Sequence, residues 1–292
     1  GTSAGVVAAI QSAKMGKSVV LIEPGKHLGG LSSGGLGATD IGNKAAIGGL
    51  SREFYRCIFN HYNPTSDSAG TMWIFEPHVA EKVFNEMVAE EEKVTVVIKE
   101  RLDLENGVKK EGTQISEIIM ESGKTYRADM FIDATYEGDL IAKSGVSYTV
   151  GREANSVYKE TLNGVQTTHA IYHQFKNPVD PYIIPGDKNS GLLPGIQDDG
   201  GPGKEGSGDK RIQAYNFRMC LTDNPEIRLP FPKPDMYDSI RYERLLRYLN
   251  SGVFDVLNLS TTMPNDKTDT NNKGTFATDN IGMNYEYPEG DY

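Results

Sequence analysis

Cysteine is scarce in this chain, whose 292 residues contain only Cys57 and Cys220, far apart in the sequence. No C-x-x-C pair occurs, which argues against a zinc or iron–sulfur site with cysteine ligands. One disulfide is compatible with the count but has no other support, so the cysteines indicate no redox compartment. Long apolar runs are missing as well. Because a membrane-spanning helix needs roughly 20 apolar residues, we expect no membrane insertion.

Basic residues are outnumbered, with 30 Lys and Arg against 40 Asp and Glu, for a net charge of −10. A negative surface repels phosphates, so we expect neither nucleic acid nor an anionic membrane as a partner. The length suffices for one large domain or two ordinary ones. No signal peptide is visible. A cytoplasmic location stays open, as does a periplasmic or secreted one if a signal peptide preceded residue 1. The oligomeric state also stays open.

Apolar periodicity predicts an α/β arrangement in the first half of the chain. Residues 3–16 show helical spacing with small alanines, and "SVVLIE" at 18–23 is typical of a buried parallel strand. The other expected elements are helices at 50–62 and 77–92, strands at 94–98 and 130–135, and an antiparallel unit of 101–105, 115–120 and 124–128.

The composition changes after about residue 150. Residues 176–210 are rich in Gly, Pro, Asp and Lys, residues 212–221 alternate like a strand, and residues 237–249 are expected to be helical. The chain ends at "YPEGDY" without a closing element, and it contains no internal repeat. We therefore expect two domains, over 1–150 and 151–292.

The first residues, "GTSAGVVAAI", indicate a dinucleotide site. A helix N-terminus after a glycine turn binds pyrophosphate through free N–H groups and the helix dipole. Gly5 matches the last glycine of the fingerprint, and Thr2 stands where its middle glycine is usual. Glu23 lies 18 residues after Gly5, at the end of a strand, where an acid accepts hydrogen bonds from ribose. The candidate residues here are Gly1, Thr2, Ser3, Ala4, Gly5, Glu23 and Pro24. A glycine-capped turn is the alternative interpretation.

The second glycine cluster, "EPGKHLGGLSSGGLG", resembles FAD proteins of the glutathione reductase type, particularly the fumarate reductase and aspartate oxidase branch. In these proteins, the segment after the ribose acid follows the pyrophosphate to the flavin ring. The resemblance assigns Gly29, Gly30, Leu31 and Ser32 to the pyrophosphate side, and Ser33, Gly34, Gly35 and Leu36 to the flavin side. A glycine-rich surface loop is the alternative. The same resemblance places Arg101 and Leu102 beside adenine, and Ala134 and Thr135 beside adenosine.

The phrases "DATYEGDL", "GRE", "YKETL" and "QAYNFRMCLT" resemble a bacterial family of FAD-dependent oxidoreductases, some of which carry xanthan lyase labels. The resemblance covers the entire chain. It implies a Rossmann-like FAD-binding α/β domain with a parallel sheet and inserted β-meander over 1–150, and part of a mixed α+β substrate or cap domain over 151–292. It also implies FAD as cofactor and a small-molecule substrate.

Complete members of that family are about twice as long, begin with a strand that ends in two glycines, and end with a segment that returns to the FAD domain. The chain therefore resembles a fragment that lacks the first strand and the C-terminal half. We expect it to bind FAD weakly or not at all. Two alternatives to an active FAD enzyme stay open: a non-catalytic fragment that no longer binds FAD, and an NAD-binding dehydrogenase, against which the second glycine cluster argues.

Flavin carries the redox chemistry in such proteins, and side chains orient the substrate and move protons. The catalytic candidates are His78, Arg152 and Arg218, each with a structural alternative: a capping histidine, a surface ion pair and a snorkelling arginine. His169 and His173, four residues apart, would share a helix face. No third ligand lies near them in the sequence, so we expect no metal site. The sequence does not identify the substrate.

Overall fold

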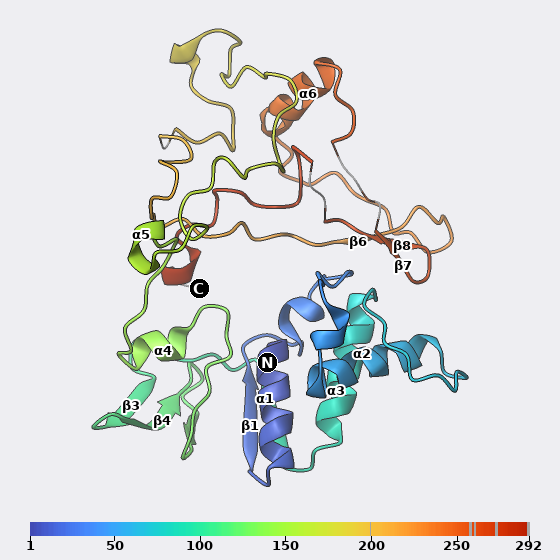
Figure 1. Cartoon of the computed structure of the whole chain (residues 1–292), viewed down its shortest axis with the longest axis vertical. Helices are drawn as coiled ribbons and strands as arrows, with labels where there is room; N and C mark the ends of the chain where they lie inside the picture. Colours follow the sequence, from blue (N-terminus) through green and yellow to red (C-terminus); the bar gives the residue numbers. More distant parts are fainter. Residues whose placement is uncertain (199, 257–258, 260, 272–273, 291–292) are drawn as a thin grey trace. The chain divides into compact units, whose positions relative to one another are not determined.

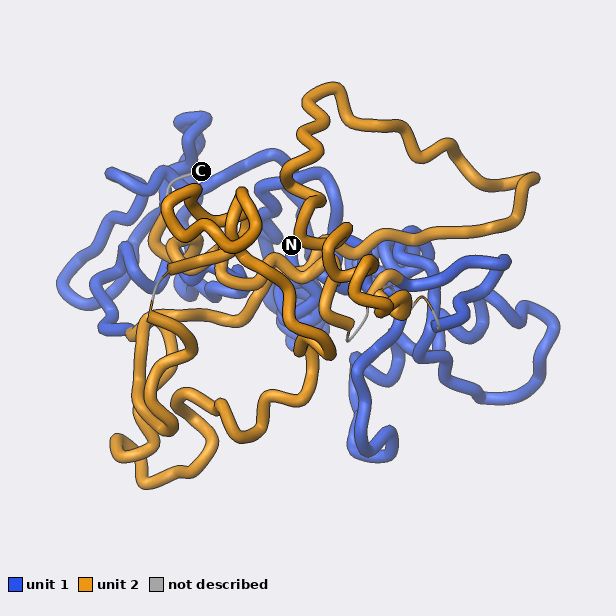
Figure 2. Tube along the Cα trace, turned by 90° about the horizontal axis from the view of Figure 1, so that it is seen from above, with its two compact units in different colours: residues 1–148, 261–269 blue, residues 149–260, 270–292 orange. Residues whose placement is uncertain are grey.

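The computed structural model describes residues 1–198, 200–256, 259, 261–271 and 274–290. The chain divides into two compact units (Figure 2). Unit 1 comprises residues 1–148 and 261–269, and unit 2 comprises residues 149–260 and 270–292. Nothing in the sequence pattern predicts the return of residues 261–269 to unit 1. The division into domains at residue 150 stays a prediction.

Unit 1 is built around three helices, α1 (Ser3–Lys14), α2 (Gly49–Tyr62) and α3 (Pro77–Ala89), and a two-stranded sheet (Figure 1). The strands β1 (Val19–Glu23) and β2 (Val94–Ile98) are parallel, in a register that joins Val19 to Val94 and Glu23 to Ile98. These elements confirm the predicted helices and both strands. The result is a mixed α/β fold with small sheets. Because the only parallel sheet among the described residues has two strands, a Rossmann arrangement is not seen.

The core of unit 1 explains why the helices form where the periodicity predicts them. Each helix buries one apolar stripe, and the buried residues of the three stripes form one cluster that also includes Leu21 of β1. Phe54 of α2 stacks on Phe84 of α3 with ring centroids 4.3 Å apart. The other core members are Val6, Ala9, Ile10, Leu28, Ile58, Phe75, Val79, Ala80, Val83, Met87 and Val88.

The predicted antiparallel unit is present as β3 (Val108–Glu111), β4 (Gln114–Ile119) and β5 (Thr125–Arg127), followed by the short helix α4 (Asp139–Lys143). The hairpin at 115–128 is therefore confirmed. The contribution expected from 101–105 is wrong in detail, because that segment contributes only an isolated bridge from Leu102 to Met120. The third strand is β3 instead.

The strand predicted at 130–135 is wrong. These residues form no strand, and Met130 and Ile132 are 80% and 64% exposed. A run of apolar residues permits a strand, but a strand also needs a neighbour that takes up its N–H and C=O groups. The segment pairs with no described strand. The strand β1 is also less buried than predicted, since Val20 is 48% exposed while Leu21 is buried.

The returning segment forms a hairpin of β7 (Thr262–Met263) and β8 (Lys267–Asp269) within unit 1. It is anchored by Glu76, whose carboxylate is 2% exposed. That carboxylate accepts hydrogen bonds from Asn265 Nδ2 (2.7 Å) and Tyr62 Oη (3.0 Å), and it forms an ion pair with Lys267. Burial opposes ionisation, but these hydrogen bonds outweigh it and lower the pKa of Glu76.

Unit 2 contains little regular structure. Its helices are α5 (Asn155–Tyr158) and α6 (Glu243–Asn250), preceded by the 3-10 helix η4 (Ser239–Tyr242). The helix predicted at 237–249 is thus confirmed in part. The strand predicted at 212–221 is mostly wrong: β6 covers only Cys220–Leu221, where the alternation is not matched by a long partner strand. Three-residue 3-10 helices occur at Gly30–Ser32, Lys44–Ala46, Lys188–Ser190 and Tyr287–Glu289.

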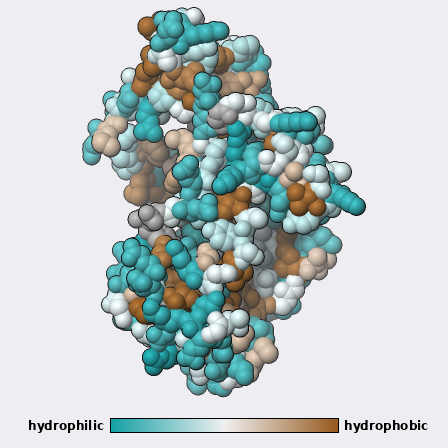
Figure 3. All heavy atoms as spheres, turned by 90° about the vertical axis from the view of Figure 1, so that its left-hand side faces the viewer, coloured by the Kyte–Doolittle hydropathy of each residue, from teal (hydrophilic) through white to brown (hydrophobic). Residues whose placement is uncertain are grey.

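Many large apolar side chains reach the surface. On the face drawn in Figure 3 they lie among hydrophilic ones, and Leu229, Phe231 and Met236 of unit 2 are each at least 80% exposed. Within the described ranges, the structure holds no helix that combines the length and the apolar character needed to cross a bilayer. Neither Cys57 nor Cys220 takes part in a disulfide.

Candidate functional site

The N-terminus of α1 carries the donors that an anion site needs. Thr2 caps the helix: its Oγ1 accepts a hydrogen bond from Gly5 N (3.2 Å) and donates one to Ala134 O (2.5 Å). The N–H groups of Ser3 and Ala4 donate to no described residue. Free amides at the positive end of a 12-residue helix favour a negatively charged ligand.

The second glycine cluster lies against this helix end. Gly29 N donates to Gly1 O at 2.8 Å, and Thr2 and Gly29 form an isolated parallel bridge. Both Gly29 (φ 106°) and Gly30 (φ 53°) have left-handed backbone, which side chains other than hydrogen disfavour. A Cβ on Gly29 would lie 2.5 Å from the Phe84 ring. Glycine is thus required here by both conformation and close packing.

Glu23 ends β1 beside the same helix. Its Oε1 accepts a hydrogen bond from Gly25 N at 2.6 Å, and its Oε2 lies 3.3 Å from the Gly1 ammonium. Its side chain is 15% exposed. At Gly5 of α1, an added Cβ would lie 3.4 Å from Ala134 Cβ and 3.6 Å from Leu21 Cδ1. These are ordinary van der Waals distances, so neither space nor backbone conformation requires glycine at position 5.

The segment after Ala134 folds into a turn held by its own side chains. Asp133 Oδ1 accepts hydrogen bonds from Thr135 N (3.0 Å) and Oγ1 (2.8 Å), and Asp133 Oδ2 accepts one from Ile141 N (3.0 Å). Thr135 Oγ1 in turn accepts one from Gly138 N (2.9 Å). The turn places Tyr136 against the glycine loop, where its hydroxyl accepts a hydrogen bond from Leu31 N at 2.7 Å.

The structure thus gathers Gly1, Thr2, Ser3, Ala4, Gly5, Glu23, Gly29, Gly30, Leu31 and Ala134 in one part of unit 1. The sequence interpretation missed Tyr136. The only signal for it was its position directly after Ala134 and Thr135 in "DATYEGDL". The binding roles of these residues stay predictions.

The other predicted cofactor residues are placed by different contacts. Gly34 N donates to Gly30 O (2.8 Å) and Leu36 N to Leu31 O (3.3 Å), so the loop that also carries Ser32 and Gly35 folds on itself. Pro24 follows Glu23 in the turn after β1. Arg101 Nε donates to Glu121 at 2.8 Å, and Leu102 bridges to Met120. Both therefore contact the β-meander.

The catalytic candidates belong to different units. His78 is an exposed residue in the first turn of α3 in unit 1. Arg152 and Arg218 belong to unit 2. Arg152 forms a two-pronged ion pair with Asp209, and the hydrogen bonds from Arg152 lower the pKa of that carboxyl. His169 and His173 do not share a helix face, because no helix covers them, and His173 Nδ1 lies 2.8 Å from Gly274 O.

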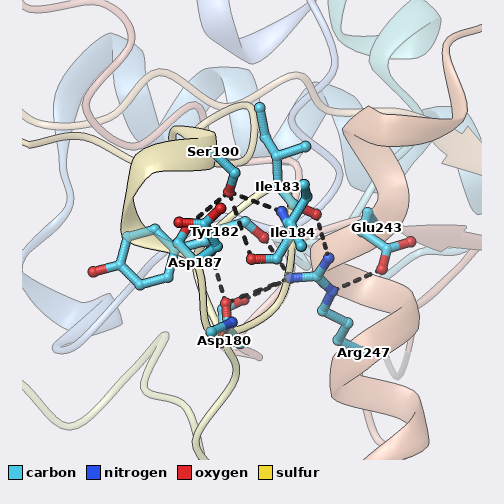
Figure 4. Close-up of polar contacts among 9 residues, drawn as sticks. Asp180, Tyr182, Ile183, Ile184, Asp187, Ser190, Glu243 and Arg247 are labelled. Atoms are coloured by element: carbon cyan, nitrogen blue, oxygen red, sulfur yellow. Dashed lines mark hydrogen bonds and ion pairs between the residues drawn. The ribbon is translucent and has the colours of Figure 1, made fainter.

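A second arginine of unit 2, Arg247, holds a loop rather than offering a free charge (Figure 4). It projects from α6 and donates to three backbone carbonyls, those of Asp180 (3.1 Å), Tyr182 (2.7 Å) and Ile183 (3.0 Å). Its Nε also donates to Glu243 at 2.7 Å. With 14% of its side chain exposed, Arg247 has a structural role in binding residues 180–183 to α6.

A family model described as FAD dependent oxidoreductase matches residues 1–292. The comparison with curated proteins found no match.

Proposed function

The chain belongs to the family of FAD dependent oxidoreductases, and from this premise we propose that the N-terminus of α1 and the glycine loop of unit 1 bind the pyrophosphate of FAD. The family indicates FAD as cofactor and oxidoreductase chemistry in general. We propose further that the reaction transfers a hydride between a small-molecule substrate and the flavin.

One observation carries the proposal. The amides of Ser3 and Ala4 donate to no described residue, and the left-handed pair Gly29 and Gly30 is held beside this start of α1 by the hydrogen bond from Gly29 N to Gly1 O. Backbone donors beside residues without side chains allow a phosphate to approach the main chain closely. Glu23 lies at the carboxyl end of β1, where it would accept hydrogen bonds from ribose hydroxyls. When bound, FAD supplies the hydride chemistry.

The two alternatives are judged by different evidence. An NAD-binding dehydrogenase would share the helix and the acid, but the family match favours FAD. A non-catalytic fragment that keeps this fold but no longer binds FAD stays the other alternative, and the affinity of the chain for FAD decides it.

A titration with FAD, followed by flavin fluorescence, tests the proposal through a matched pair of glycine variants. Gly30 and Gly112 both have left-handed backbone, with φ of 53° and 66°. A Cβ on Gly30 would collide with Tyr136 and lie 3.1 Å from Thr2 Cα, whereas one on Gly112 would meet nothing within 4 Å. The pair therefore separates close approach from backbone strain.

We expect Gly30→Ala to weaken FAD binding by about tenfold or more, equivalent to ~1.4 kcal/mol, and Gly112→Ala to leave it unchanged. Circular dichroism of each variant checks that the fold is kept. Equal affinities in both variants, or wild-type protein that binds no FAD at millimolar concentration, would overturn the proposal.

A further inference from the structure

We infer that Tyr136 is an additional cofactor-binding residue, whose hydroxyl donates a hydrogen bond to the pyrophosphate held by the glycine loop. The identity of this ligand rests on the proposed function. The inference concerns a side chain that neither the fingerprint nor the family match assigns.

The position of the hydroxyl is the first support. Tyr136 Oη lies 2.7 Å from Leu31 N, on the loop that is hydrogen-bonded to the start of α1. A Cβ built on Gly30 would point at both Tyr136 Oη and Thr2 Cα. The hydroxyl and the cap residue Thr2 therefore lie on the same side of Gly30, next to the start of α1.

The hydrogen-bonding capacity of the phenol is the second support. A tyrosine hydroxyl has one proton to donate and two lone pairs. The amide of Leu31 occupies one lone pair, while the O–H proton has no acceptor within the part of the chain that the structure describes. An amide that donates to a hydroxyl polarises it and makes it a better donor. The proton is thus available to an anion at this point.

The support of Tyr136 by its own turn is the third observation. The carboxylate of Asp133 binds both the amide and the hydroxyl of Thr135, and Thr135 Oγ1 accepts from Gly138 N. Tyr136 lies between these anchors, so its backbone is fixed before any ligand arrives. The residue as a whole is 54% exposed. A preorganised donor binds an anion without the cost of ordering.

If the Tyr136 hydroxyl competed with the phosphate, its removal would have the opposite effect on ligand affinity. If the phenol merely occupied the Leu31 amide in place of a phosphate oxygen, removal of the hydroxyl would tighten binding. The Tyr136→Phe variant therefore distinguishes a donor from a competitor by the sign of its effect. Tyr126→Phe is the matched control, because Tyr126 lies in β5 of the same unit and its hydroxyl bonds to no described residue.

The experiment measures dissociation constants of the full chain for FAD and, separately, for inorganic pyrophosphate by isothermal titration calorimetry. Because Tyr136→Phe would lose a hydrogen bond to a charged group, we expect its affinity for both ligands to fall by about tenfold. The affinity of Tyr126→Phe should not change. Pyrophosphate binding that depends on Tyr136 without FAD binding would support this inference and refute the proposed function. FAD binding that is unchanged or tighter in Tyr136→Phe would refute the inference alone, and no binding of either ligand would refute both.

Discussion

The two units of this chain are each stabilised by a different kind of interaction. Unit 1 has three helices of 12 to 14 residues whose apolar stripes meet in one core. Unit 2 has one helix of eight residues, one of four, and few buried apolar side chains, among them Val165, Leu193, Tyr248 and Val253. Side chains that bind backbone take the place of a core there. Arg247 holds residues 180–183, and Glu205 accepts hydrogen bonds from Thr167 and Thr168 that lower its pKa to about 2.

This difference in stabilisation indicates which unit can hold a phosphate-binding site. A phosphate site of backbone amides needs a helix end that does not move, and the core of unit 1 fixes α1, the glycine loop and Phe84 beneath it. Polar contacts in loops orient segments but contribute only about 1 kcal/mol each. Unit 1 is therefore the part that would hold a cofactor.

The largest expected effect comes from Phe84→Ala. Phe84 is 2% exposed, stacks on Phe54 and supports Gly29, so its loss should cost unit 1 about 3–5 kcal/mol of unfolding free energy. The control is Met130→Ala in the same unit, where the side chain is 80% exposed and the change should be within about 0.5 kcal/mol. Urea unfolding followed by fluorescence of Trp73, the single tryptophan, reports on unit 1. Similar effects of the two variants would mean that unit 1 is not held by this core.

A smaller effect is expected from Glu76→Gln, which tests the anchor of the returning hairpin. The variant leaves Lys267 without its carboxylate partner and should cost about 2 kcal/mol at pH 7. Glu92→Gln, on an exposed carboxylate without a described partner, is the control. The same urea unfolding measures both.

The difference in unfolding free energy between wild type and Glu76→Gln should depend on pH, because the pKa of Glu76 is lowered. A carboxyl with a depressed pKa in the folded state stabilises the fold fully above its unfolded pKa of about 4.3 and loses this contribution as the pH falls through the folded value. The gap between wild type and Glu76→Gln should therefore shrink below about pH 4. A gap that grows on acidification would contradict the assignment.

The smallest effect is expected from Arg247→Lys in unit 2. Lysine cannot reach three carbonyls with one ammonium. The free energy of local opening of the loop at 180–190 should therefore fall by about 1–2 kcal/mol. Hydrogen exchange measures this at the amides of Ile183 and Leu193, which donate to Gly191 O and Pro181 O. Arg241→Lys, on an exposed residue, should leave the exchange of both amides unchanged. Unaltered exchange in Arg247→Lys would show that the loop is held by other contacts.

The same contrast shows what the sequence could predict. The helices at 3–14, 49–62 and 77–89 follow from local periodicity, and the strands at 19–23 and 94–98 from short apolar runs beside them. The spacing of Gly5 and Glu23, and a family resemblance for Gly29 and Gly30, predicted cofactor roles that stay predictions. The strand expected at 130–135 failed because pairing depends on a neighbour, which no local pattern contains.

Contacts between residues that are far apart in the chain could not be predicted from the sequence. Glu76 and Lys267 are 191 positions apart, and Tyr136 and Leu31 are 105 apart. No periodicity or spacing relates such pairs. The hairpin at 262–269 and the tyrosine beside the glycine loop are therefore findings of the structure.

The most direct test of the cofactor site is an amide NMR titration of the full chain with FAD. We expect the resonances of Ser3, Ala4, Gly30 and Leu31 to shift together along one saturation curve, because these amides surround the proposed pyrophosphate position. This result does not require tight binding, since millimolar affinity is detectable in this way. Shifts confined to unit 2, or no shifts at saturating FAD, would contradict the assignment of the site to unit 1.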